Sequence, residues 1–183
     1  MTEQESGPAE VVTRGPAGGL PWLTAINARL SRYAMYIACT CLASLLAVVV
    51  YGVVLRYGFN HAPPFVEQIA LLLVISVAMF GASAGVRDAG HIGLDSAVRL
   101  LPVKAQFWCR VLVHLLSIVF ALALLTGGAE MAHSTAATTI PTLGVSEATR
   151  YIPIMSAGIL ITLFSSEHLI AQFCGMEVVP SWN

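Results

Sequence analysis

Charged residues are scarce in this 183-residue chain: Asp, Glu, Lys and Arg make up 10% of it, whereas 57% is apolar. Soluble domains carry about a quarter charged residues, and so few charges cannot cover a water-exposed surface of this size. The formal net charge of −1 predicts no nucleic-acid partner. The sequence also lacks a glycine-rich phosphate loop, zinc-ligand spacing and a collagen-like period. The apolar surplus is therefore expected to face the lipid bilayer.

Cysteines are few as well, and all four lie inside or at the end of apolar runs: Cys39, Cys41, Cys109 and Cys174. A helix would place Cys39 and Cys41 on different faces, which fits neither a redox pair nor a metal clamp. We interpret them as small packing residues. No catalytic residue, cofactor or metal is predicted from this sequence, and no enzyme activity is expected.

Four apolar runs reach the roughly 20 residues that a membrane-spanning helix needs. They are Tyr33–Leu55, Phe65–Val86, the run that follows Arg110 and continues to Ala129, and Tyr151–Phe173. Prolines at 63, 64, 102 and 153 stand near the starts of the last three, where a helix tolerates proline. The sequence thus predicts an all-α membrane protein with four transmembrane helices.

Basic residues near the spans predict the orientation. The first and third connections have only two basic residues, Arg56 and Arg150. Six basic residues lie before the first span or around the second connection: Arg29, Arg32, Arg87, Arg99, Lys104 and Arg110. Because Lys and Arg near short loops resist translocation, both termini are expected in the cytoplasm. Residues 1–28 and 176–183 are expected to be cytoplasmic tails, the first disordered, around a four-helix domain at 29–175. A short interfacial helix, capped by Asp95 and covering 96–101, is expected between the second and third spans.

Polar groups inside the spans are few, and an ionisable group there is a functional candidate. His114 and His168 could ligate a b-type haem, so a haem or quinone redox protein is one alternative. A small self-sufficient transporter, which would use Arg110 and Glu167, is another. The plainer interpretation is a hydrogen bond between packed helices. Small residues that permit close helix packing occur at Gly81, Gly85 and Gly158.

Two further polar groups flank the second span. Arg56, Asn60 and Glu67 precede it or begin it. We expect Asn60 to satisfy backbone groups in the turn, and Arg56 to pair with Glu67. Three more follow the span in order: Arg87, His91 and Asp95. Ordinary helix capping explains a charge at each helix end but does not explain the whole ordered set.

The ordered set resembles the small membrane subunit of tripartite ATP-independent periplasmic (TRAP) transporters, the DctQ-like family. The resemblance runs from about Arg56 to Tyr151. Members often have Trp and paired acids where Phe65, Glu67 and Gln68 stand here. The resemblance depends on four motifs in sequence: Arg56-Tyr57-Gly58-Phe59-Asn60, Glu67, Arg87-x-x-x-His91-Ile92-x-x-Asp95 and Ile140-Pro141-Thr142-Leu143-Gly144.

The resemblance implies a three-part importer in the bacterial inner membrane. A periplasmic binding protein captures a solute, often an organic acid, and a large membrane subunit carries the solute and sodium sites. The small subunit packs against the large one and extends its scaffold. On this reading the six polar residues around the second span serve structure or partner contact, and the chain itself carries out no transport chemistry.

Overall fold

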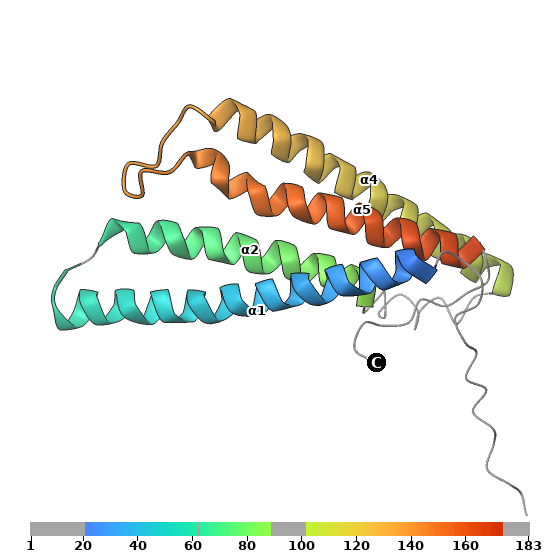
Figure 1. Ribbon diagram of the computed structural model, residues 1–183, viewed down its shortest axis with the longest axis horizontal. Coiled ribbons are helices and arrows are strands. Elements are labelled where there is room, and N and C mark those ends of the chain that lie inside the picture. The colour runs from blue at the N-terminus through green and yellow to red at the C-terminus, as the bar shows by residue number, and fades with distance from the viewer. Residues whose placement is uncertain (1–20, 62, 89–101, 174–183) are drawn as a thin grey trace, which may run out of the picture.

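The computed structural model describes residues 21–61, 63–88 and 102–173 and shows an all-helical protein (Figure 1). Its long helices are α1 (Pro21–Gly58), α2 (Pro64–Asp88), α4 (Val103–Thr135) and α5 (Ile152–Phe173). A short 3₁₀ helix, η1 (Glu147–Tyr151), leads into α5. All four long helices are long and apolar enough to cross a bilayer. The predicted fold class, an all-α protein with four spans, is confirmed.

Two helices differ in length from the sequence prediction. α1 begins at Pro21, so residues 21–28 of the expected tail are helical. α4 runs from Val103 to Thr135 and includes Arg110 and Glu130, which were expected at its boundaries. Apolar runs mark the part of a helix that lies in hydrocarbon, whereas backbone hydrogen bonds continue across a charged residue. Both helices are therefore longer than the apolar runs that predicted their membrane-spanning parts.

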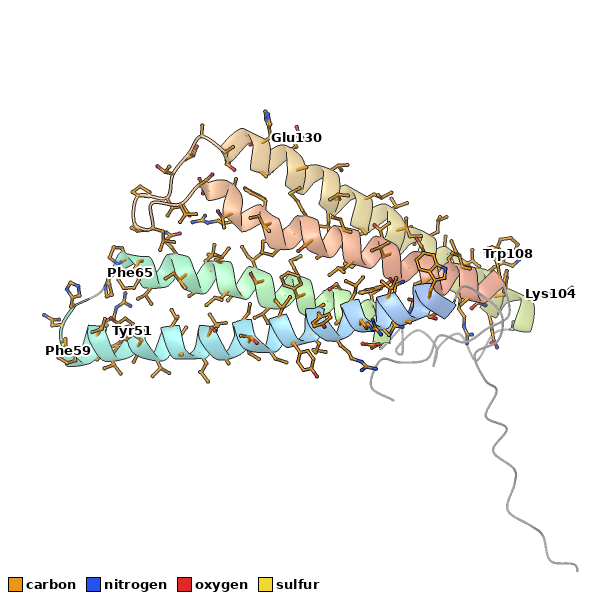
Figure 2. The ribbon with its side chains drawn as sticks, viewed as in Figure 1. Tyr51, Phe59, Phe65, Lys104, Trp108 and Glu130 are labelled. Carbon is orange, nitrogen blue, oxygen red and sulfur yellow. The ribbon has the colours of Figure 1, made fainter. Side chains whose placement is uncertain are left out.

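The helices lie side by side in the order α1, α2, α5, α4 (Figure 1). α1 and α4 form the two edges, and α1 meets α5 less extensively than it meets α2. We call the end where α1 and α4 begin the cluster end, and the opposite end the loop end. Figure 2 shows Lys104 and Trp108 near the cluster end, and Tyr51, Phe59 and Phe65 near the loop end. This arrangement leaves both edge helices with wide faces that no other helix covers.

α1 contacts its neighbours along one narrow stripe. Asn27, Ser31, Ala34 and Ala38 are buried at alternating spacings of four and three residues, as in a coiled-coil seam. Farther along, a Cβ on Gly52 would lie 2.7 Å from Val66 Cγ1 of α2. Most of the large apolar side chains of α1 point elsewhere and are exposed, which is the burial pattern of a helix that faces lipid.

α4 and α5 pack through small residues near the middle of the bundle. Ala121 of α4 and Ala157 and Ile161 of α5 form a buried cluster, against which Met79 and Val86 of α2 pack. Between them, a Cβ on Gly158 would lie 2.9 Å from the carbonyl oxygen of Ala121. The backbones of α4 and α5 therefore approach each other closely at Gly158.

The third connection is an ordered turn. The amide of Leu143 donates to Ile140 O at 3.1 Å, and the amide of Gly144 donates to the same oxygen at 2.9 Å. Gly144 has φ of 66°, a conformation that glycine adopts without steric cost. Residues 140–144 therefore form a hydrogen-bonded turn. The expected helix at 96–101, His91, Asp95, residues 1–20 and the C-terminal tail lie outside the described residues.

Candidate functional site

A buried ion pair joins α2 to α5 at the cluster end. Arg87 Nε lies 3.4 Å from Glu167 Oε2, and the two side chains are 1% and 2% exposed. Both residues come near the C-terminal ends of their helices, where α2 and α5 run side by side. Charges so deeply buried are stable only when they are paired and hydrogen-bonded. The pair is therefore a candidate for a specific structural or functional role.

Residues of α1 extend the pair into a three-helix cluster. The Asn27 side-chain amide donates to Glu167 Oε2 at 2.9 Å, and Arg87 Nη2 donates to the carbonyl oxygen of Thr24 at 3.4 Å. On the other side, Ser31 Oγ donates to Asp88 Oδ2 at 2.6 Å. Asp88 Oδ1 in turn accepts from Arg87 Nη1 at 3.1 Å. We call these residues the polar cluster; it comprises Thr24, Asn27, Ser31, Arg87, Asp88 and Glu167.

The polar cluster tethers the start of α1 to the ends of α2 and α5. Arg87 shares its guanidinium among two carboxylates and one carbonyl oxygen, each contacted by a different nitrogen. Glu167 Oε1, by contrast, has no hydrogen-bond partner among the described residues. Removing one member of a buried pair leaves an uncompensated charge and costs about 3–5 kcal/mol. The geometry thus makes the cluster a strong determinant of how these three helices pack.

The two membrane histidines lie directly beside the polar cluster. Their rings stack with centroids 5.2 Å apart and planes at 1°. His168 Nε2 lies 3.0 Å from the carbonyl oxygen of Arg87, so this nitrogen already has a hydrogen-bonding contact. This arrangement favours a packing and hydrogen-bonding role for His114 and His168. An axial haem ligand instead needs a ring nitrogen directed at the iron.

The corner between α1 and α2 carries the second polar group at the loop end. Arg56 Nη2 lies 3.4 Å from Glu67 Oε1, so the expected ion pair is present, although its side chains are 57% and 75% exposed. Asn60 contributes through its backbone, with φ of 48°. This left-handed residue turns the chain so that the amide of His61 donates to Leu55 O at 3.0 Å.

A second polar contact at the loop end ties η1 to α2. Arg150 Nη2 is hydrogen-bonded to Gln68 Oε1, and Arg150 Nη1 pairs with Glu147 Oε1 at 3.1 Å. Ser146 caps η1 by accepting from the amide of Ala148 at 3.3 Å. Arg150, which the sequence marked only as a basic loop residue, therefore connects the entry to α5 with the first turns of α2.

The three packing glycines differ in their surroundings. A Cβ on Gly158 would meet α4 backbone atoms at 2.9 and 3.1 Å. A Cβ on Gly81 or Gly85 would meet nothing within 4 Å, so close packing at these two positions does not occur within the described part of the chain.

Several members of the polar cluster escaped the sequence prediction. Arg87 was recognised, but Asn27 and Ser31 lay in or near the expected tail, and Glu167 was considered only for the alternative of a self-sufficient transporter. A signal was present: Asn27, Ser31, Ala34 and Ala38 continue one helical face. Glu167 is also the only Asp, Glu, Lys or Arg in the run 151–173. Predicting one continuous helix across residue 32 would have placed Asn27 and Ser31 on the same face as Ala34 and Ala38.

Comparisons with known proteins identify the family of this chain. The family described as the DctQ component of tripartite ATP-independent periplasmic transporters matches residues 45–175. A Haemophilus influenzae protein with the provisional description TRAP transporter small permease protein is 25% identical over 139 residues, covering 75% of this chain and 86% of the relative. The family match includes all of α2, α4 and α5 and the last part of α1. The chain therefore belongs to the DctQ family of TRAP transporter components, a family of small membrane permease subunits.

Proposed function

We propose that this chain packs against the large solute- and sodium-carrying subunit of a TRAP transporter and stabilises it. The complex would import an organic, anionic solute that a periplasmic binding protein delivers. The observation that carries this proposal is the family match over residues 45–175, which covers most of the four-helix bundle. The proposed symport with sodium, like the class of solute, also rests on the family membership of the chain.

The internal contacts support a scaffold role. The charges of the polar cluster contact one another, neighbouring side chains or backbone oxygens of the same chain. A solute site would instead need polar groups directed at a shared space, usually at broken helices near the bilayer midplane. The four helices are each continuous over their stated ranges. A haem or quinone role gains no support from the stacked His114 and His168.

The small-residue face of α2 is a candidate surface for the large subunit. Gly81 and Gly85 have no neighbour within 4 Å of a built Cβ, and small residues are enriched where transmembrane helices approach closely. The face also lies between the exposed polar corner, Arg56 and Glu67, and the polar cluster. We propose that Arg56, Asn60 and Glu67 fix the outer corner for docking, and that Arg87, His91 and Asp95 organise the inner side.

In the proposed orientation, both termini of the subunit lie on the cytoplasmic side of the inner membrane. Thiols introduced at Asn60 or Thr138, in a chain without its own cysteines, should react with an impermeant maleimide in intact spheroplasts. A thiol at Ala97 should react only after the membrane is opened. Labelling of Ala97 in sealed cells would reverse the assignment, because short basic loops are held on the cytoplasmic side.

Reconstitution tests the function. Proteoliposomes should contain the large subunit with the binding protein, the same mixture plus this chain, or this chain alone. We expect sodium-driven uptake only in the complete mixture. Uptake by the isolated chain would favour the small-transporter alternative. Full uptake without the chain would contradict a required scaffold role, and an absorption band of bound haem in the purified chain would favour the redox alternative.

A further inference from the structure

The first part of α1 has its polarity reversed relative to a helix in water. Over residues 24–33 the buried positions are the polar residues Asn27 and Ser31. By contrast, Trp22, Ile26 and Tyr33 are 58%, 44% and 65% exposed. A water-facing helix buries its apolar stripe and exposes its polar one. This segment does the opposite because its polar side chains serve the polar cluster. Its outer face therefore needs a surrounding that accepts aromatic and aliphatic groups.

The outward residues form one continuous face. Positions 22, 26, 29 and 33 follow the spacing of four, three and four residues that keeps side chains on one side of a helix. Arg29 lies on this side, and Arg32, which is also exposed, lies about a quarter turn away at its border. The exposed surface thus combines two aromatic rings, an aliphatic side chain and two guanidinium groups. We call it the headgroup face; its members are Trp22, Ile26, Arg29, Arg32 and Tyr33.

Charge and length favour a lipid headgroup layer as the occupant. Among the described residues, the exposed charged side chains at the cluster end are basic, Arg29, Arg32 and Lys104, whereas exposed acids such as Glu67 and Glu130 lie toward the loop end. Trp and Tyr prefer the membrane interface, and arginine binds phosphate through two parallel hydrogen bonds. With 38 residues, α1 is also longer than the 20 or so that hydrocarbon requires.

We propose that the headgroup face binds the anionic phospholipid of the adjoining leaflet. Arg29 and Arg32 would hold phosphate oxygens, while Trp22 and Tyr33 lie among the glycerol and upper acyl groups. The bilayer would then press the start of α1 onto α2 and α5 from outside, while the polar cluster holds it from inside. This proposal concerns the lipid contact of the headgroup face alone and does not rest on the proposed function.

The position of Trp22 can be measured in the full-length chain. The substitutions Trp108→Phe and Trp182→Phe leave Trp22 as the sole tryptophan. In vesicles, phospholipids brominated near the glycerol end of the acyl chain should quench its fluorescence more strongly than aqueous acrylamide does. Strong acrylamide quenching without lipid quenching would overturn the proposal, because the segment would then project into water. Loss of lipid quenching when the large subunit is added would assign the face to protein instead.

The charge requirement is tested by lipid retention. The purified chain is exchanged into nanodiscs of phosphatidylcholine with phosphatidylglycerol, and retained lipids are counted by native mass spectrometry. Each of Arg29→Gln and Arg32→Gln should lower the preference for phosphatidylglycerol about fivefold, the factor that corresponds to about 1 kcal/mol per arginine near a membrane surface. Arg56→Gln, an exposed arginine at the loop end, is the matched control and should leave it unchanged. No preference, or equal loss in all three variants, would overturn the proposal.

Discussion

The two ends of the bundle each carry an Arg–Glu ion pair, and their surroundings differ sharply. At the cluster end, Arg87 and Glu167 are 1% and 2% exposed and share hydrogen bonds with α1. At the loop end, Arg56 and Glu67 meet at the same distance of 3.4 Å, but 57% and 75% of their side chains are exposed. Distance alone therefore does not distinguish the two pairs, whereas burial and additional partners do.

Burial changes what an ion pair contributes. In water an exposed pair is screened and adds about 0–1 kcal/mol. In a dry interior the attraction within the pair offsets a large desolvation cost, so the intact pair need not stabilise the fold. Removing one partner is strongly destabilising, because it leaves the other charge buried and uncompensated. The cluster-end pair is thus expected to determine which helices pack together. The loop-end pair is expected to make only a small contribution to the geometry of the exposed corner between α1 and α2.

Removing the buried carboxylate should produce the largest effect. Glu167→Leu takes away one of the two carboxylates that Arg87 contacts and the acceptor of the Asn27 side-chain amide. We therefore expect a loss of about 3–5 kcal/mol in unfolding free energy. Reversible unfolding of the purified chain in mixed micelles measures it. Glu130→Leu, on the outer side of α4 (Figure 2), is the matched control and should cost under about 0.5 kcal/mol. Equal losses in the two variants would remove the distinction between buried and exposed acids.

A double-mutant cycle sharpens the same comparison. The coupling between Arg87→Met and Glu167→Leu should exceed about 1 kcal/mol, because the two groups are in contact and dry. The coupling between Arg56→Met and Glu67→Leu should stay below about 1 kcal/mol. Similar couplings at both ends would mean that burial in the isolated chain does not set the strength of these pairs.

Substitution of Gly158 should produce the next largest effect. This residue lies at the contact between α5 and the edge helix α4, which has no member in the polar cluster. In Gly158→Ala the new methyl meets Ala121 O and the Leu125 amide nitrogen of α4 at 2.9 and 3.1 Å. Backbone atoms cannot move aside cheaply, so we expect a loss of about 1–3 kcal/mol in the same unfolding assay.

Gly81→Ala is the matched control for Gly158→Ala. It has open space around the built Cβ and should stabilise the isolated helix by up to about 1 kcal/mol. If the large subunit covers this face, Gly81→Leu should leave the isolated chain folded and reduce co-purification of the complex. Unchanged co-purification would place the large subunit on another face.

The sequence predicted the elements of the fold better than their contacts. Long apolar runs and prolines predicted α2 and α5 nearly to their ends, because hydrocarbon thickness sets the length of a span. The same criterion placed the start of α1 too late, since residues 21–32 carry polar side chains that face inward. The order of the helices in space, with α5 between α2 and α4, depends on contacts between helices. These contacts cannot be predicted from any one segment of the sequence.

The candidate site was predicted in part for a related reason. Arg56 and Glu67 are near in sequence, so helix and turn geometry indicated their pairing. Glu167 lies 80 residues from Arg87 and 140 from Asn27, and only the folded arrangement brings them together. Local signals thus identified the exposed pair, whereas the buried cluster required the positions of three helices.

The turn at the loop end should show a smaller effect. Asn60 has φ of 48°, a left-handed conformation that costs most side chains about 1–2 kcal/mol and that Asn and Gly tolerate better. Asn60→Ala should therefore lose about 1 kcal/mol of unfolding free energy, and Asn60→Gly much less. If Asn60→Gly loses as much as Asn60→Ala, the side-chain amide rather than the backbone conformation carries the role of this residue.

The exposed acid should give the smallest effect on folding and a separate effect on assembly. Glu67→Gln removes one charge of a pair that solvent screens, so the isolated chain should lose under about 1 kcal/mol of unfolding free energy. Glu67 also lies in the first turn of α2, where a carboxylate interacts favourably with the helix dipole. If this corner contacts the large subunit or the binding protein, the charge becomes shielded on docking and its loss matters more there. Glu67→Gln should then lower the yield of the complex and the uptake rate at unchanged expression of the chain. Gln68→Ala, which removes the nearby contact with Arg150, separates charge from general disturbance of the corner. Wild-type uptake and complex yield in Glu67→Gln would show that the corner shapes the loop end without forming part of a docking surface.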